Sequence, residues 1–69
     1  MNGALKKLRT DKRMTQAEIA NRAGITEVTY QLYEYGKRTP NIRTAIRIAD
    51  VLGVHDLRTL WDGNPIQQV

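Results

Sequence analysis

Apolar residues of this 69-residue chain recur at steps of three and four positions rather than at every second position. This period is typical of α-helices that bury one face. The pattern is interrupted at glycine and proline residues, which favour turns. The interruptions fall at Gly24, residues 36–40, Gly53 and residues 63–65. The chain is therefore predicted to be all-α, with five helices.

The first two predicted helices carry clear start signals. The first covers about residues 2–12 and turns Ala4, Leu5 and Leu8 inward. The second opens at Thr15, and Glu18 follows three positions later. This spacing is a capping box, in which each side chain satisfies the other residue's backbone amide. The expected buried face of the second helix consists of Ile19, Ala20 and Ala23.

A short connection separates the second helix from the third. Gly24 suits the left-handed conformation that ends a helix, and Thr26 suits the N-cap of the next one, which runs to Tyr35. Three residues leave room only for a sharp angle, with the small side chain of Ala20 near the crossing. Tyr30 and Tyr33 are predicted to face inward. The outward residues are then Glu27, Val28, Gln31, Leu32 and Tyr35.

The last two predicted helices complete the domain. The fourth covers about residues 41–52, with Asn41 as N-cap. Its apolar stripe is Ile42, Ala45, Ile46, Ala49 and Leu52. The fifth begins at His55 or Asp56 and ends at Trp61. Residues 1–61 are therefore predicted to form one domain, followed by a short flexible tail over residues 62–69.

Composition narrows the classes of function. The chain has no cysteine, no serine and a single histidine, so common catalytic constellations and closed metal sites cannot be built, and no catalytic residue, metal or cofactor is predicted. Residues 1–13 lack the apolar core of a signal peptide, and no apolar run is long enough to span a bilayer. We expect a cytoplasmic protein with no membrane partner and no small-molecule substrate.

The charge balance favours a polyanionic partner. Eleven lysine and arginine residues against seven aspartate and glutamate residues give a formal net charge of +4. An excess of this size fits nucleic acid, but it also fits an ordinary solvated surface.

Residues 16–35, QAEIANRAGITEVTYQLYEY, resemble the helix-turn-helix unit of the lambdoid phage repressor and Cro family, also called the Xre family. The flanking segments LKKLR (residues 5–9), YEYGKRTP (33–40) and IADVLGV (48–54) resemble the same pattern, so that about residues 3–61 are covered. The resemblance implies a compact five-helix repressor-like domain. It also implies a sequence-specific transcriptional regulator, expected to be a repressor, that binds a double-stranded DNA operator as a homodimer.

An α-helix fits the major groove, where base edges can be distinguished. In the family, the N-terminal part of the third helix meets those edges. Gln31 could bond an adenine edge, and Val28 could touch a thymine methyl group. Glu27 could accept from a cytosine amino group or serve only to stabilise the helix, and Val28 and Leu32 could instead belong to the core. The expected base contacts are Thr26, Glu27, Val28, Gln31 and Leu32.

Phosphate contacts require hydrogen-bond donors. Gln16 and the backbone amides of residues 35–37 match positions that touch the DNA backbone in the family. The alternative for Lys37, Arg38 and Arg43 is that they belong to an ordinary solvated loop. The expected phosphate contacts are Thr15, Gln16, Tyr35, Lys37, Arg38, Asn41 and Arg43.

Two further expectations concern contacts between helices and between copies of the chain. Arg9 and Glu34 match the pair that ties the first helix to the end of the third in the family. Leu57, Leu60 and Trp61 either form a dimer contact or close the core. The alternative function is that of an antitoxin or another protein-interaction module on the same fold, one that also controls its own promoter.

Overall fold

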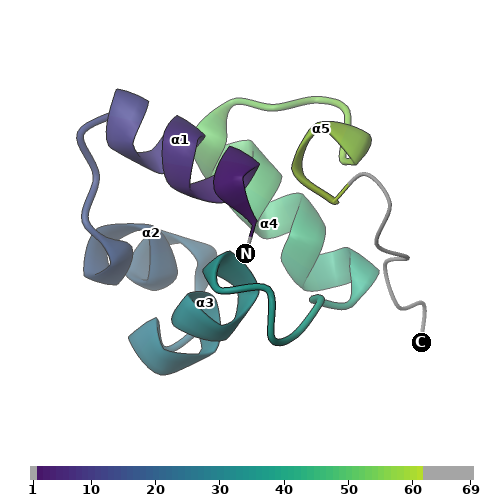
Figure 1. Cartoon of the computed structure of the whole chain (residues 1–69). Helices are drawn as coiled ribbons and strands as arrows, with labels where there is room; N and C mark the ends of the chain where they lie inside the picture. The colour runs from purple at the N-terminus through teal and green to yellow at the C-terminus, as the bar shows by residue number, and fades with distance from the viewer. Residues whose placement is uncertain (1, 62–69) are drawn as a thin grey trace.

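The computed structural model describes residues 2–61, which form five helices, as predicted (Figure 1). The predicted tail, residues 62–69, lies outside the described residues. No helix within residues 2–61 is long and apolar enough to cross a membrane. The helices are α1 (Gly3–Asp11), α2 (Gln16–Ala23), α3 (Glu27–Glu34), α4 (Ile42–Leu52) and α5 (Arg58–Trp61).

Each of the first four helices starts at a polar side chain that accepts a hydrogen bond from a backbone amide three residues later. Such a cap stabilises a helix by about 1 kcal/mol. The predicted capping box at α2 is present, with Thr15 and Glu18 each accepting from the other's amide at 3.0 Å. The four N-caps are Asn2, Thr15, Thr26 and Asn41.

The end of α2 sets the direction of α3. Gly24 has a φ of 74°, in the left-handed region, as predicted. A Cβ atom at this position would lie 3.9 Å from the Arg47 side chain, which is ordinary contact. Glycine is therefore required by the backbone conformation and not by a lack of space. The turn brings α3 against α2, and the pair lies at the end of the molecule away from α5 (Figure 1).

The core lies between α4 and the helices packed around it. α2 packs against both α3 and α4, while α1 packs against α3 and α5 (Figure 1). Ile19, Ala20 and Ala23 are buried, as the capping and spacing predicted. The buried apolar residues are Leu5, Met14, Ile19, Ala20, Ala23, Tyr30, Ala45, Ile48, Ala49, Leu52, Leu60 and Trp61.

Two details differ from the sequence prediction. Ile46 was expected in the core, but it is 46% exposed, and Ile48 is fully buried instead. Both residues fit a step of three or four along α4, so the period alone does not choose between them. The fifth helix begins at Arg58 rather than at residue 55 or 56, because the Asp56 carboxylate accepts from the Arg58 amide at 3.0 Å and forms a turn before the helix.

Asn2 joins three helices at one point. Its Oδ1 accepts from the Leu5 amide, its Nδ2 donates to the Leu60 carbonyl at 2.6 Å, and its backbone amide donates to the Glu34 carbonyl at 2.9 Å. The start of α1 is thereby tied to the last residue of α3 and to α5.

Candidate functional site

The two sides of α3 differ sharply in exposure. Tyr30 and Glu34 face the interior and are 0% and 1% exposed, whereas Val28 is 66% exposed. Thr26 and Glu27 are also exposed, and Gln31 and Leu32 are half-buried. Within residues 2–61, the outer side of α3 is open at its first turn and partly covered at Gln31 and Leu32. Val28 is therefore a surface residue, and the alternative that it belongs to the core is wrong.

The residues expected to bind phosphate come from three places that follow or precede α3. Thr15 and Gln16 lie at the start of α2, Tyr35, Lys37 and Arg38 in the loop after α3, and Asn41 and Arg43 at the start of α4. All are exposed except Gln16 and Asn41, which are half-buried. A hydrogen bond of 3.1 Å between Gln16 and Gln31 brings the start of α2 to the middle of α3.

The loop after α3 corrects one expectation. The backbone amides of Tyr35, Gly36 and Lys37 donate to carbonyls of α3 at 2.8, 3.2 and 2.9 Å. These amides already donate hydrogen bonds to the last turn of the helix. They cannot also donate to a phosphate without breaking these bonds. Anion binding at this loop is left to the side chains of Lys37 and Arg38, which are both exposed.

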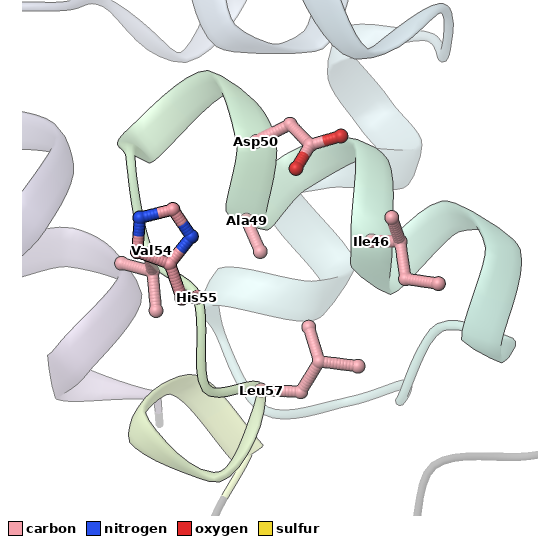
Figure 2. Close-up of a pocket in the computed structure, with 6 residues that line it drawn as sticks. All are labelled: Ile46, Ala49, Asp50, Val54, His55 and Leu57. Carbon is pink, nitrogen blue, oxygen red and sulfur yellow. The ribbon is translucent and has the colours of Figure 1, made fainter.

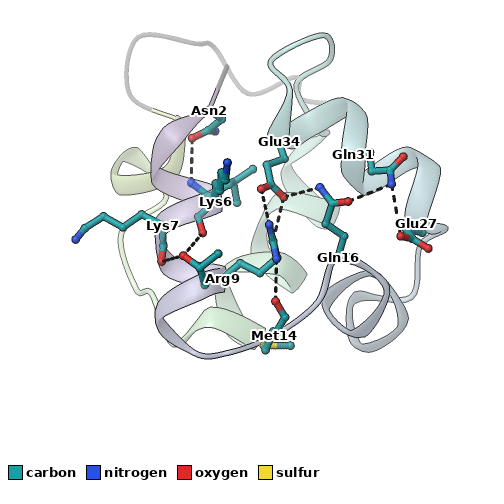
Figure 3. A network of polar contacts seen from close by, with 11 residues as sticks. Asn2, Lys6, Lys7, Arg9, Met14, Gln16, Glu27, Gln31 and Glu34 are labelled. Carbon is teal, nitrogen blue, oxygen red and sulfur yellow. Dashed lines mark hydrogen bonds and ion pairs between the residues drawn. The ribbon is translucent and has the colours of Figure 1, made fainter.

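Arg9 and Glu34 form the predicted pair between α1 and α3 (Figure 3). The guanidinium donates to both carboxylate oxygens, Nε to Oε2 at 3.1 Å and Nη2 to Oε1 at 2.9 Å. Its Nη1 also donates to the Met14 carbonyl at 2.8 Å, just before α2. One side chain of α1 thus fixes the end of α3 and the approach to α2.

The surroundings of Glu34 favour its charged form. Burial alone would raise the pKa of this carboxyl, but hydrogen bonds from Arg9 and Gln16 outweigh burial and lower the pKa below its usual value. The hydrogen bond to Glu34 in turn raises the pKa of Arg9. The pair is therefore ionised at neutral pH, when both partners can hold α3 in place.

The polar contacts continue from this pair to the surface (Figure 3). Gln16 Nε2 donates to Glu34 Oε2 at 3.2 Å, and Gln31 Nε2 donates to Gln16 Oε1 at 3.1 Å and to Glu27 Oε2 at 3.5 Å. Two residues assigned to different tasks by the sequence, Gln16 and Gln31, are therefore in direct contact. Nothing in their spacing of fifteen residues indicated this link, because it depends on the angle between α2 and α3.

Other polar residues of the site keep hydrogen-bonding capacity. Thr15 Oγ1 accepts from the Glu18 amide, so its hydroxyl proton is left for an external acceptor. Asn41 Oδ1 accepts from the Thr44 amide at 2.9 Å, which leaves its NH2 group. The hydroxyl of Thr26 both accepts from the Thr29 amide and contacts the Thr29 hydroxyl at 2.8 Å. Of these three side chains, Thr26 therefore keeps the least hydrogen-bonding capacity for an external partner.

A second surface lies away from α3, between α4 and the segment before α5 (Figure 2). It is a shallow hollow of about 310 Å³ lined by Ile46, Ala49, Asp50, Val54, His55 and Leu57. Leu57 packs partly against the core and keeps part of its surface. Leu60 and Trp61 are 2% and 4% exposed, so they close the core and have almost no surface for a dimer contact.

Comparisons with known proteins identify the family. A protein-family model described as Helix-turn-helix matches residues 5–56. The chain is similar to the uncharacterized HTH-type transcriptional regulator YqaE of Bacillus subtilis, at 44% identity over 50 residues, which are 72% of this chain and 43% of the relative. It is similar to the cryptic phage CTXphi transcriptional repressor RstR of Vibrio cholerae, at 34% identity over 72% of this chain and 45% of the relative.

A further relative has nearly the same length. This uncharacterized HTH-type transcriptional regulator of Archaeoglobus fulgidus is 32% identical over 90% of this chain and 97% of its own length. The chain spans less than half the length of the two relatives from Bacillus subtilis and Vibrio cholerae. No solved structure matches the chain significantly. The family match agrees with the arrangement of α2, Gly24 and α3, and the chain belongs to the helix-turn-helix family.

Proposed function

We propose that this protein is a sequence-specific DNA-binding regulator of transcription that inserts α3 into the major groove of an operator. The observation that carries the proposal is the open outer side of α3, which is held from behind by buried Tyr30 and Glu34. A helix fits the width of the major groove, and the residues nearest its N-terminus reach base edges. The proposed base contacts are Thr26, Glu27, Val28, Gln31 and Leu32.

Phosphate binding would fix the position of α3 along the groove. Lys37 and Arg38 supply positive charge beside the C-terminal end of α3, and Thr15 and Gln16 supply neutral donors beside its middle. Such contacts carry affinity and orientation but no sequence information. Tyr35, Asn41 and Arg43 extend the proposed set along the loop and the start of α4.

Titration with salt tests the proposal directly. The protein is mixed with a fluorescent duplex, and the dissociation constant is measured at a series of salt concentrations. If n phosphates are neutralised, the logarithm of the binding constant should fall with the logarithm of salt with a slope of about −0.9n. A module that binds only proteins would bind DNA weakly or show no such slope. Selection from a random duplex pool then gives the operator.

We further propose a homodimer that represses transcription in the cytoplasm. A second copy doubles a small contact surface and matches two half-sites about one helical turn apart. The relative RstR is named a transcriptional repressor, which supports this sign of regulation. Leu57 with exposed Ile46 offers the apolar surface for the second copy (Figure 2).

Sedimentation equilibrium with and without DNA tests the dimer. Ile46→Lys and Leu57→Lys place charge on this surface and should reduce self-association and the affinity for a palindromic duplex. Binding to a single half-site should be unchanged. The matched control is Thr10→Lys on the exposed side of α1, which adds the same charge away from the hollow and from the proposed DNA contacts. If the consensus is palindromic but Ile46→Lys and Leu57→Lys lose no affinity for it, the interface lies elsewhere.

A further inference from the structure

The polar chain from Arg9 to Glu27 determines which atoms of Gln31 remain free (Figure 3). Its end groups have fixed hydrogen-bonding character, because a guanidinium can only donate and an ionised carboxylate can only accept. Two amide side chains, Gln16 and Gln31, lie between these groups. An amide can be turned either way on its own, but here its neighbours leave one choice.

The orientation of Gln16 follows from Glu34. The group of Gln16 that lies 3.2 Å from Glu34 Oε2 must be the NH2 group, since two acceptors would repel each other. The oxygen of Gln16 then points to the other side, toward α3. It receives a hydrogen bond there from Gln31 Nε2 at 3.1 Å.

The orientation of Gln31 follows from Gln16 and is reinforced by Glu27. The NH2 group of Gln31 lies 3.1 Å from Gln16 Oε1 and 3.5 Å from Glu27 Oε2, so both of its hydrogens face acceptors of the protein itself. The carbonyl oxygen Oε1 accepts no hydrogen bond from any residue in the described range 2–61. Gln31 therefore offers an acceptor at the surface and no free donor.

We propose that Gln31 is a specificity-determining residue that reads its base as an acceptor only, selecting cytosine through N4 or adenine through N6. This inference rests on the proposed function and adds the class of base that α3 selects. Guanine O6 and thymine O4 would set an acceptor against the Gln31 oxygen. The two-bond contact of glutamine with adenine N6 and N7 is excluded as well, because it needs a free amide hydrogen. For adenine, the contact that the sequence indicated is thereby limited to N6, and cytosine is added as a second base that Gln31 can select.

The buried ion pair fixes the orientation of the Gln31 amide indirectly, through a chain of hydrogen bonds. Arg9 keeps Glu34 ionised, Glu34 orients Gln16, and Gln16 orients Gln31. Gln16 is thus a positioning residue for specificity in addition to its proposed phosphate contact. Replacing it with leucine keeps a side chain of similar size, removes both hydrogen bonds and frees the Gln31 amide to turn.

The first test needs no DNA. The two side-chain amide proton resonances of Gln31 are recorded by NMR in the free protein and in Gln16→Leu. We expect them to be displaced from the values of a solvated glutamine in the native chain and to return toward those values in the variant. Asn21→Leu, an exposed position of α2 outside the polar chain, is the matched control and should leave them unmoved. Solvated values in the native chain would overturn the proposal.

The second test uses base analogues in a duplex obtained by selection from a random pool. The base read by Gln31 is the one at which Gln31→Ala loses discrimination, and we expect cytosine or adenine there. Removing the exocyclic amino group leaves the Gln31 oxygen without its partner and should weaken binding roughly five- to 150-fold. Where the base is adenine, replacing it with 7-deazaadenine should leave the affinity unchanged, and where it is cytosine, replacement by guanine should be discriminated against.

In Gln16→Leu, the freed amide can donate, so sensitivity to 7-deazaadenine should appear, or discrimination against guanine should fall. Circular dichroism melts confirm that the variant is folded. Guanine or thymine as the selected base, or a loss with 7-deazaadenine in the native chain, would overturn the proposal while leaving DNA binding itself intact. Failure of the proposed function has a different signature, which is the absence of salt-dependent binding to any duplex, with the NMR result unaffected.

Discussion

On the inner side of α3, Tyr30 and Glu34 retain 0% and 1% of their surface, whereas Val28 on the outer side of the same helix keeps 66%. The inner side is fixed by packing and by the bidentate pair with Arg9. The outer side is held in place but makes few contacts of its own. Its residues are therefore free to be chosen for a partner rather than for stability.

Among changes to the inner side of α3, Glu34→Ala should lower stability the most. The variant leaves the Arg9 guanidinium, whose side chain is 12% exposed, without its counter-charge. Removing one partner of a buried pair costs about 3–5 kcal/mol of the free energy of unfolding, which is a large share of the stability of a small domain. Urea unfolding followed by circular dichroism measures this loss.

Lys7→Ala is the matched control for that experiment. Lys7 and Asp11 also form an ion pair, but their atoms are 3.9 Å apart and both side chains are more than half exposed. The change should stay below about 1 kcal/mol. If the two variants lost similar amounts, the inner side of α3 would not depend on its buried pair.

Acid weakens the same contact without a change of sequence. The pKa of Glu34 is lowered in the folded chain, so its contribution is fully present above the ordinary value of 4.5 and is lost as the pH falls through the lowered value. The native chain should therefore lose stability below about pH 4.5, by less than Glu34→Ala loses at neutral pH.

Glu34→Gln keeps the shape of the side chain and does not titrate. The stability difference between this variant and the native chain should narrow as the pH falls from 7 to 3, as measured by urea midpoints. Exposed carboxyls with lowered pKa values, Glu18 and Asp56, are present in both proteins and cancel in the difference. A constant difference across this range would assign the acid sensitivity to other groups.

The inner side of α3 and most of the fold could be predicted from the sequence because they depend on local rules. The N-caps Thr15, Thr26 and Asn41 and the left-handed Gly24 follow from short-range chemistry, and all four are present. The Arg9–Glu34 pair came from the resemblance to a family and not from spacing.

The parts that could not be predicted depend on how helices meet. Ile46 and Ile48 satisfy the same period, and only the packing of α4 decides which one is buried. The contact between Gln16 and Gln31 requires the crossing of α2 and α3. The contact between Gln16 and Gln31 changes what the candidate site can offer to DNA, and the exposure of Ile46 changes the proposed dimer surface.

The outer side of α3 should respond in binding rather than in stability. Gln31→Ala is expected to weaken binding to the selected operator by about 1–3 kcal/mol and to change binding to random DNA little. Arg38→Ala, in the loop, should weaken both by similar amounts and lower the salt slope by about 1. Equal losses on selected and random DNA for Gln31→Ala would remove this residue from the base-reading set. Both are measured by fluorescence anisotropy.

The smallest effect on stability is expected for a substitution at Val28. It can be compared with a substitution of Tyr30 on the opposite side of the same helix. Val28→Ala removes two exposed methyl groups and introduces a better helix former, so the free energy of unfolding should change by no more than about 0.5 kcal/mol. Tyr30→Ala, only two positions later, should cost about 3–5 kcal/mol because it opens a cavity in the core. If Val28→Ala also weakens binding to the operator but not to random DNA, its methyl groups contact a base. A loss of stability comparable to that of Tyr30→Ala would mean that Val28 is covered in solution, and α3 could not then enter a groove as proposed.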